Sequence, residues 1–280
     1  MRVERYSEDE AEEQLLKLEY RLAQIERVEA CQDNYLSFVR SMWPEFIAGR
    51  HHKIMAEKLE RVASGDLKRL IINMPPRHTK SEFASYLFPA WMIGKNPAMK
   101  IIQATHTTEL AVNFGRKIKN LLERDEYLEI FPDAALSADS KASGRWDTAR
   151  GGMHSEQTAM SLNGFDDAWD WYTGGPRQRL QPGGAIIVVM TRWSEKDLTG
   201  QLIRAQGRDE LADTWEVIEF PMEMPSGGPL WPEFWSFEEM QAVKGSIPLP
   251  KWNAQYQQNP TGDENAIIKR EWWNVWDKDQ

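Results

Sequence analysis

The sequence predicts a three-layer α/β domain with a mostly parallel central sheet, preceded by N-terminal helices. Short apolar runs typical of buried strands occur at 69–74, 100–105, 185–190 and 215–220. Helical patterns follow the first three of these runs along the chain. This strand–helix alternation is typical of parallel βαβ units, which place helices on both faces of a sheet.

The N-terminal part is expected to be helical. Residues 7–30 are expected to form one exposed helix, because Ser7 begins a capping signature with Glu10. A loose apolar stripe lies among its charged residues, at Leu15, Leu16, Leu18, Leu22 and Ile25. A solvated arm is the preferred interpretation of this helix. A second helix is expected over 32–47, with a bend at Pro44.

The helices of the α/β part have recognisable starts and stops. A third helix is expected over 51–64, ended by the Ser-Gly-Asp sequence that follows. Another is expected over 80–93, after the first strand. Thr107 or Thr108 is expected to cap a long amphipathic helix. Its buried face is expected to contain Leu110, Phe114, Ile118, Leu121 and Leu122.

Composition excludes several classes of protein. With 41% hydrophobic and 28% charged residues, the 280-residue chain has an ordinary soluble globular composition. No apolar run approaches the roughly 20 residues that span a bilayer, and the acidic N-terminus is unlike a signal or transit peptide. A net charge of −9 argues against a bulk nucleic-acid coat. Cys31 is the single cysteine, so no internal disulfide framework is expected.

Histidine and tryptophan give weak signals. No Cys/His cluster has the spacing of a zinc site. His51 and His52 are adjacent, which is poor geometry for joint ligation on a helix, and they are interpreted as polar surface. Tryptophans cluster at 169–172 and 271–276. Core and rim packing is the preferred interpretation of both clusters, over base stacking.

The stretch LIINMPPRHTKSEFASY (70–86) places Lys80 and Ser81 where a phosphate-binding loop would have them, after a buried strand and at a helix start. Such a loop needs converging backbone N–H groups, a helix N-terminus and a lysine, and a hydroxyl after the lysine can ligate Mg²⁺. Met74 and Thr79 stand where glycines are usual, and an unusual backbone angle is costly for a β-branched residue. From these residues alone, a solvated turn with an ordinary lysine is at least as good an interpretation.

Several motifs in order resemble phage large terminase subunits, the DNA-packaging motors. INMPPRHTKSEFASYLFPAWMIG resembles their ATP-binding loop, which commonly reads P-P-R-H-G-K-S or P-P-R-H-T-K-S. The segments around AGRHHKIMAEKLERVASGDLKRL, THTTELAVNFGRKIKNLLERDEYLEIF, RLQPGGAIIVVMTRWSEKDLTGQL and KWNAQYQQNP resemble terminase sequence as well. The resemblance covers most of 45–275. It implies a P-loop NTPase-like domain over 46–222 that uses ATP and Mg²⁺.

The resemblance also implies roles for the residues of the loop. Lys80 would contact the β- and γ-phosphates, and Ser81 would ligate Mg²⁺. Arg77 matches a family arginine that stabilises charge on the transferring phosphoryl group. The backbone N–H groups of His78, Thr79 and Lys80 would wrap the phosphates.

The MTRW motif that follows the strand at 185–190 resembles the coupling motif of the family. Thr191 would sense the γ-phosphate and transmit its loss to the helix beyond, which Ser194 and Asp197 are expected to open. The alternative for Thr191 and Arg192 is a strand end capped by polar residues.

Two further arginines, Arg177 and Arg179, are candidates for an arginine finger donated to a neighbouring subunit. Plain surface charges are the preferred interpretation of both.

The acidic strand end that hydrolysis requires was sought and not found in the sequence. In the family, an apolar run ends in an Asp that holds the Mg²⁺ shell and a second acid that orients water. Asp166 and Asp167 are an acidic pair without a preceding strand, and they are expected in the first turn of a helix. Relative to the family pattern, a block of about two dozen residues that holds this strand is missing near Met153. Its loss is expected to leave 185–190 with an unpaired edge.

The expected organisation has three parts. Residues 1–45 form a helical arm, 46–222 form the ATPase-like domain, shortened near 153, and 223–280 form an irregular segment with a short helix in 249–260. This last part leads toward a nuclease domain that the chain lacks, so no nuclease activity is expected.

The resemblance implies a motor that packages double-stranded DNA into procapsids and works as a homo-oligomeric ring. The implied partners are the portal protein and the small terminase subunit, in the host cytoplasm and without a membrane. Hydrolysis by this chain is in doubt without the acidic pair. The alternative is a catalytically inactive remnant, or a binding module that docks to the portal or small subunit.

Overall fold

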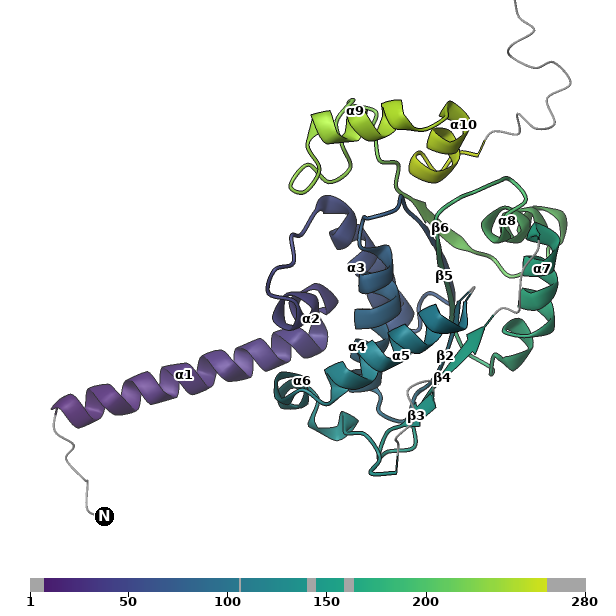
Figure 1. Cartoon of the computed structure of the whole chain (residues 1–280). Coiled ribbons are helices and arrows are strands. Elements are labelled where there is room, and N and C mark those ends of the chain that lie inside the picture. The colour runs from purple at the N-terminus through teal and green to yellow at the C-terminus, as the bar shows by residue number, and fades with distance from the viewer. Residues whose placement is uncertain (1–7, 106, 140–144, 159–163, 261–280) are drawn as a thin grey trace, which may run out of the picture. The chain divides into compact units, whose positions relative to one another are not determined.

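The structure is a computed structural model of the whole chain. It has a mixed α/β fold with helices and two small sheets (Figure 1). The residues that it describes are 8–105, 107–139, 145–158 and 164–260. The predicted tryptophan cluster at 271–276 and His106 lie outside these ranges.

Packing divides the chain into two compact units that interleave along the sequence. Unit 1 comprises residues 1–46 and 85–157, and unit 2 comprises residues 47–84 and 158–280. This division describes packing, so the three-part organisation expected from the sequence stays a prediction.

Unit 1 consists mainly of helices, two of which lie at the start of the chain. α1 spans Glu8–Asp33 and confirms the expected N-terminal helix. α2 spans only Tyr35–Met42, with the Asn34 side chain as its N-cap, so the prediction of a bent helix over 32–47 is wrong. Trp43 has φ −132° and ψ 85°, because the residue before Pro44 is disfavoured in the helical region and the helix ends there.

The core of unit 1 is aromatic. α4 (Phe88–Lys95), α5 (Thr108–Leu122) and α6 (Asp125–Ile130) complete its helices. The Tyr35 ring lies 5.3 Å from the Trp91 ring, and the Phe38 ring lies 6.1 Å from the Tyr127 ring. Thr107 is confirmed as the cap of α5, since its hydroxyl accepts from the amide of Leu110, and Leu110 is only half-buried on that helix.

The sheet of unit 1 has the order β2-β4-β3, formed by Lys100–Thr105, Met153–Thr158 and Arg145–Asp147. β3 and β4 are antiparallel, with Trp146 opposite His154. Their rings stack at 4.9 Å. The sheet of unit 1 is therefore not the all-parallel arrangement of simple βαβ units.

The sheet of unit 2 is parallel throughout its described strands. β1 (Arg69–Asn73) lies between β5 (Ile186–Met190) and β6 (Glu216–Glu219). Ile71 pairs with Val188 on one side and with Val217 on the other. α3 (Arg50–Ser64) packs on β1 and ends at Gly65, whose φ of 88° is the left-handed conformation that glycine adopts at no steric cost.

The predicted single central sheet is wrong, because the strands belong to two three-stranded sheets. β5 is the terminal strand of its sheet, and among the described strands only β1 pairs with it. This agrees with the unpaired edge expected for 185–190.

The remaining helices of unit 2 are α7 (Phe165–Gly174) and α8 (Leu198–Arg208). They contribute Tyr172 and Leu202 to a small core with Ile71 and Trp215. Asp166 and Asp167 lie in the first turn of α7, as predicted.

The segment after residue 222 is more regular than predicted. α9 (Phe237–Ser246) begins with a capping box between Ser236 and Glu239, and α10 (Leu249–Lys251) leads into a π-helical turn at Trp252–Tyr256. Met222, Met240 and Trp252 form its core. The capping box and these apolar residues were available in the sequence, where the abundance of Pro and Gly hid them.

The helix predicted over 80–93 begins as a π-helix at Glu82–Leu87 before it becomes α4. Pro89 cannot donate the bond that Ser85 O would receive in an α-helix. Gln103 Nε2 donates to that oxygen instead, at 2.9 Å. The boundary between the two units falls within this π-helical stretch.

Candidate functional site: the loop after β1

The loop after β1 has a strained backbone. Arg77 and Thr79 both have φ of 63°, in the left-handed region that residues other than glycine rarely adopt. Each such residue costs on the order of 1–2 kcal/mol. Thr79 stands where a glycine is usual, and this conformation is costly for a β-branched residue. Backbone turned in this way directs successive N–H groups into one concavity that suits an anion.

The backbone N–H groups of His78, Thr79 and Lys80 lie in this turn. Among the described residues, none of the three donates a hydrogen bond to another group. Backbone N–H groups in native proteins almost always have an acceptor, either in the protein or in water. A group with several acceptor oxygens, such as a phosphate, would satisfy all three.

A directed chain of hydrogen bonds holds Thr79. The amide of Gly49 donates to His52 Nδ1 at 2.9 Å, so that nitrogen carries no proton. His52 Nε2 therefore carries the proton and donates to Thr79 Oγ1 at 2.6 Å. Thr79 Oγ1 in turn donates to His78 O at 2.6 Å. These bonds offset part of the backbone strain, and they require His52 to be neutral.

The prediction that His51 and His52 form polar surface is wrong. Both are fully buried, and their rings lie 3.8 Å apart. Burial lowers the pKa of His51 to about 3 and the pKa of His52 to about 2, with a smaller effect from neighbouring histidines. Both side chains are therefore neutral at neutral pH, as the bond from Gly49 requires for His52.

His78 is also buried and faces inward from the loop. Its Nδ1 lies 2.8 Å from Pro76 O. A carbonyl only accepts, so Nδ1 holds the proton and Nε2 presents a lone pair. Burial lowers the pKa of His78 to about 4, despite the opposing effect of its bond to Pro76. The side chain anchors the loop to the interior while the backbone turns outward.

The Lys80 side chain is half-buried, and its ammonium group has no carboxylate partner among the described residues. Its Nζ donates to Pro75 O at 3.2 Å, within the loop itself. Burial lowers the pKa of Lys80 to about 8. An anion in the loop would stabilise the charged form and reverse this shift, so the side chain is suited to bind phosphate.

Ser81 and Arg77 flank these groups in different environments. Ser81 is half-buried at the start of the helix, and Arg77 is exposed. No described residue accepts a hydrogen bond or ion pair from the Arg77 side chain. Both side chains are therefore available to a ligand at the loop.

Aromatic rings from a distant segment pack behind the loop, and the sequence analysis missed them. The His52 ring lies 5.1 Å from the Trp231 ring, and the His78 ring stacks on Trp235 at 5.9 Å. Several buried ring nitrogens here lack a hydrogen-bond partner among the described residues: both of His51, Nε2 of His78, and Nε1 of Trp231 and Trp235. In the sequence, the aromatic LWPEFW run at 230–235 was the one indication of this packing.

The MTRW motif at the end of β5 is hydrogen-bonded to backbone atoms of the same loop. Thr191 Oγ1 donates to Met74 O at 2.9 Å. The amide of Met74 donates to Met190 O at 3.1 Å. Thr191 is thus joined to the first residue of the loop, and its hydroxyl proton is already used.

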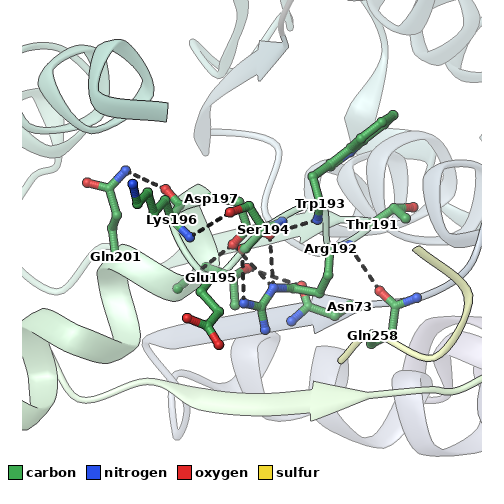
Figure 2. A network of polar contacts seen from close by, with 12 residues as sticks. Asn73, Thr191, Arg192, Trp193, Ser194, Glu195, Lys196, Asp197, Gln201 and Gln258 are labelled. Carbon is green, nitrogen blue, oxygen red and sulfur yellow. Dashed lines mark hydrogen bonds and ion pairs between the residues drawn. The ribbon is translucent and has the colours of Figure 1, made fainter. Parts of the chain in front are cut away.

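Arg192 is buried and neutralised by acids (Figure 2). Its Nε donates to the carboxylate of Asp197 at 3.0 Å, and its Nη1 lies 3.2 Å from Glu219. Figure 2 shows its side chain reaching toward the turn at 194–197, while the ring of Trp193 points away. Arg192 therefore fits the alternative of a capped strand end.

Asp197 organises the whole turn after β5. One carboxylate oxygen accepts from the amides of Trp193 and Ser194, at 2.9 and 3.3 Å, and the other accepts from the amide of Gly200 at 2.9 Å. Asp197 is thereby the N-cap of α8. Ser194, which was expected to open this helix together with Asp197, lies before the cap. A Cβ at Gly200 would collide with Glu195 O, so glycine permits the close turn.

Glu219, at the end of β6, links the ends of the three parallel strands. Asn73 Nδ2 donates to Glu219 at 2.9 Å, and Thr199 donates to Asn73 Oδ1 at 3.1 Å. Gln258 closes the opposite side, since its Oε1 accepts from the amide of Arg192 at 3.1 Å. Sequence reasoning missed Glu219 and Gln258, because their partners lie 27 and 66 residues away.

A cavity of about 410 Å³ opens at this network, lined by Arg192, Glu195, Arg204, Glu219 and Gln258 among others. No residue of the loop 74–81 lines it. Arg192 and Glu219 already form an ion pair with each other, so two of the charges at this cavity are neutralised within the protein.

Among the described residues around the loop, no acidic side chain is positioned to activate a water molecule. Among the described residues, none has a carboxylate bonded to Ser81, and no cluster of three acidic, histidine or cysteine side chains could hold a metal ion. Asp197 and Glu219, the carboxylates of the network at the strand ends, are paired with Arg192. Arg177 forms an ion pair with Asp213 at 2.8 Å, as expected of a surface charge.

The loop can therefore hold an anion with backbone amides and one ammonium, and a single hydroxyl is placed to ligate a cation. No family model matches the chain, and no curated protein matches it in sequence. No helix in the described part of the chain combines the length and the apolar character needed to cross a membrane.

Proposed function

We propose that this chain is the motor segment of a phage large terminase subunit, and that it binds ATP with Mg²⁺ through the loop 74–81 without efficient hydrolysis. One observation carries the proposal. Among the described residues, the amides of His78, Thr79 and Lys80 have no acceptor and the Lys80 ammonium has no carboxylate partner, and all four groups belong to one strained turn. These are the donors that a P-loop offers to phosphates.

The described residues fit the nucleotide better than they fit its hydrolysis. Lys80 would bind the terminal phosphates, and the amides of His78 and Thr79 would donate to the other phosphate oxygens. Ser81 would ligate Mg²⁺. Mg²⁺ commonly takes one or two protein ligands besides phosphate and water. Bound ATP would supply the phosphoryl group whose hydrolysis, in an active motor, drives movement of double-stranded DNA.

The acids of the neighbouring strands cannot replace the missing pair in this arrangement. Asp197 accepts bonds from three amides and from Arg192, and Glu219 is bonded to Asn73 and Arg192. Removing one catalytic element from such sites costs roughly a thousandfold in rate or more. We therefore expect turnover far below about one per second.

Calorimetric titration of the full chain with Mg·ATP tests the proposal. Binding is expected at pH 7.5, and it is expected to weaken as the pH rises above about 8, where Lys80 loses its proton. The Lys80→Ala variant is expected to lose binding. Lys196→Ala is the matched control, because Lys196 is an exposed lysine in the neighbouring loop. Failure of the wild-type chain to bind nucleotide would refute the proposal.

A second candidate is a catalytically inactive module that docks to the portal protein or the small terminase subunit. The paired acids at the ends of β5 and β6 favour it over an active motor. ATP turnover separates the two candidates. Slow turnover that is lost in Lys80→Ala would favour the motor segment, whereas the absence of both turnover and nucleotide binding would favour the module.

A further inference from the structure

α1 carries an apolar seam that no other described residue of unit 1 covers. Leu15, Leu18, Leu22 and Ile25 follow each other at intervals of three, four and three residues. Each side chain is more than half exposed, at 56%, 60%, 56% and 54%. Alternation of three and four is the a/d pattern of a coiled coil, in which the seam faces a partner helix.

The opposite face of α1 is the one that packs on unit 1. Gln24, Arg27 and Cys31 are half-buried or buried. Arg27 donates to Ser41 Oγ at 3.2 Å and forms an ion pair with Glu129 at 2.7 Å. At about 100° per residue, this face points roughly away from the seam. A second helix could therefore lie along the seam without displacing any contact within unit 1.

The charges beside the seam specify the partner and its direction. With Leu15 and Leu22 at a, the e positions are Glu12, Glu19 and Glu26, and a g position is Arg21. In a parallel pair of these helices, each g residue meets the e residue of the next heptad in the partner. Arg21 of one copy then meets Glu26 of the other. An antiparallel pair would bring the rows of glutamates together, which is unfavourable.

We infer that α1 forms a parallel coiled coil with α1 of a second copy of this chain. The seam is apolar, heptad-spaced and self-complementary in charge, and it faces away from the body of unit 1. Ala11 extends it by one d position, and Glu29 ends it at the next a position. Because the seam spans only two to three heptads, association is expected to depend on protein concentration.

Light scattering over a roughly hundredfold range of concentration tests the inference on the full chain. The mass is expected to rise from one copy toward an assembly of two or more. Leu18→Glu is expected to raise the concentration of half-association by about tenfold or more. Leu16→Glu is the matched control with the same substitution, because Leu16 is equally exposed, at 60%, and lies off the seam.

A charge exchange tests the identity of the partner. Arg21→Glu is expected to weaken association, and the double variant Arg21→Glu/Glu26→Arg is expected to restore it. Restoration requires that both partners carry the same sequence, so it distinguishes a second copy from a different protein. Leu18→Cys under mild oxidation is expected to give a symmetric disulfide between copies, whereas Leu16→Cys is expected to give little.

Three results would overturn the inference. They are a single-copy mass for the wild-type chain over the whole range, equal effects of Leu16→Glu and Leu18→Glu, and failure of the charge exchange to restore association. Circular dichroism confirms that each variant remains folded. The outcome is independent of the nucleotide site, which lies in unit 2.

Discussion

The loops that follow β1 and β5 leave neighbouring parallel strands, yet they differ in whether their polar groups have partners within the protein. In the loop 74–81, three amides and the ammonium of Lys80 lack an anionic partner among the described residues. In the turn 191–197, the carboxylate of Asp197 satisfies two amides of the turn and the buried guanidinium of Arg192. The first loop is therefore built to receive an anion, and the second already contains its own.

The two loops differ in how much backbone strain and how much unpaired charge they contain. The first loop keeps two residues at positive φ and a half-buried cation, which are costs that a bound phosphate would offset. The second loop has no residue at positive φ, and its buried cation is paired. Its hydrogen bonds connect Met74, Asn73 and α8. It therefore joins the first loop to α8 through hydrogen bonds within the protein.

The largest expected effect comes from breaking the second loop. Asp197→Ala leaves the buried Arg192 without its closest carboxylate and removes the N-cap of α8. We expect a loss of about 3–5 kcal/mol in the free energy of unfolding, measured by urea denaturation. Glu195→Ala, an exposed acid of the same turn, is expected to change it by less than about 0.5 kcal/mol. Equal effects would mean that Asp197 does not organise the turn.

Removing the cation of the first loop should affect binding and leave stability intact. Lys80→Ala is expected to weaken Mg·ATP binding by at least about a hundredfold, or about 2.7 kcal/mol. Its free energy of unfolding should stay the same or rise slightly, because a half-buried charge is removed. Parallel calorimetry and urea denaturation measure the two quantities. A variant that loses stability and binds normally would contradict the assignment.

The buried histidines behind the first loop should make stability depend on pH. The pKa of His51 is about 3 in the folded chain and about 6.5 when unfolded, so the unfolded state binds more protons between these values. Stability contributed by neutral His51 is thus lost as the pH falls below about 6.5, at about 1.4 kcal/mol per pH unit. His51→Phe should reduce the loss between pH 7.5 and 5.5 by about that amount. Urea denaturation at both pH values checks it, and an unchanged slope would contradict it.

The smallest effect should come from relieving strain at Arg77. Its side chain is exposed and its φ is 63°, so Arg77→Gly removes backbone strain without removing a packing contact. We expect stability to rise by about 0.5–1 kcal/mol while nucleotide affinity falls. Thermal denaturation with and without Mg·ATP measures both changes. A loss of stability would show that the left-handed conformation is not strained in this loop.

Local sequence signals predicted the elements that depend on local causes. The cap at Thr107 and the acids in the first turn of α7 were both expected from nearby residues. The end of α2 was predicted too far along, because the effect of Pro44 on the residue before it was underestimated. These features need only a few neighbouring residues to be read correctly.

Contacts between distant segments decided the features that the sequence analysis missed. The burial of His51 and His52 depends on Trp231, which lies about 180 residues further along. Arg192 could have been a free cation, and only its position beside Glu219 of β6 and Asp197 of the following turn shows that it is neutralised.

The sequence by itself determined that a strand, a tight turn and a lysine at a helix start follow one another at residues 69–81, because these depend on local propensity and spacing. Only the tertiary structure decided which charges remain without partners, since a charge is neutralised by whatever the fold brings beside it. For that reason the residues of the candidate site could be located from the sequence, whereas the state of each residue could not.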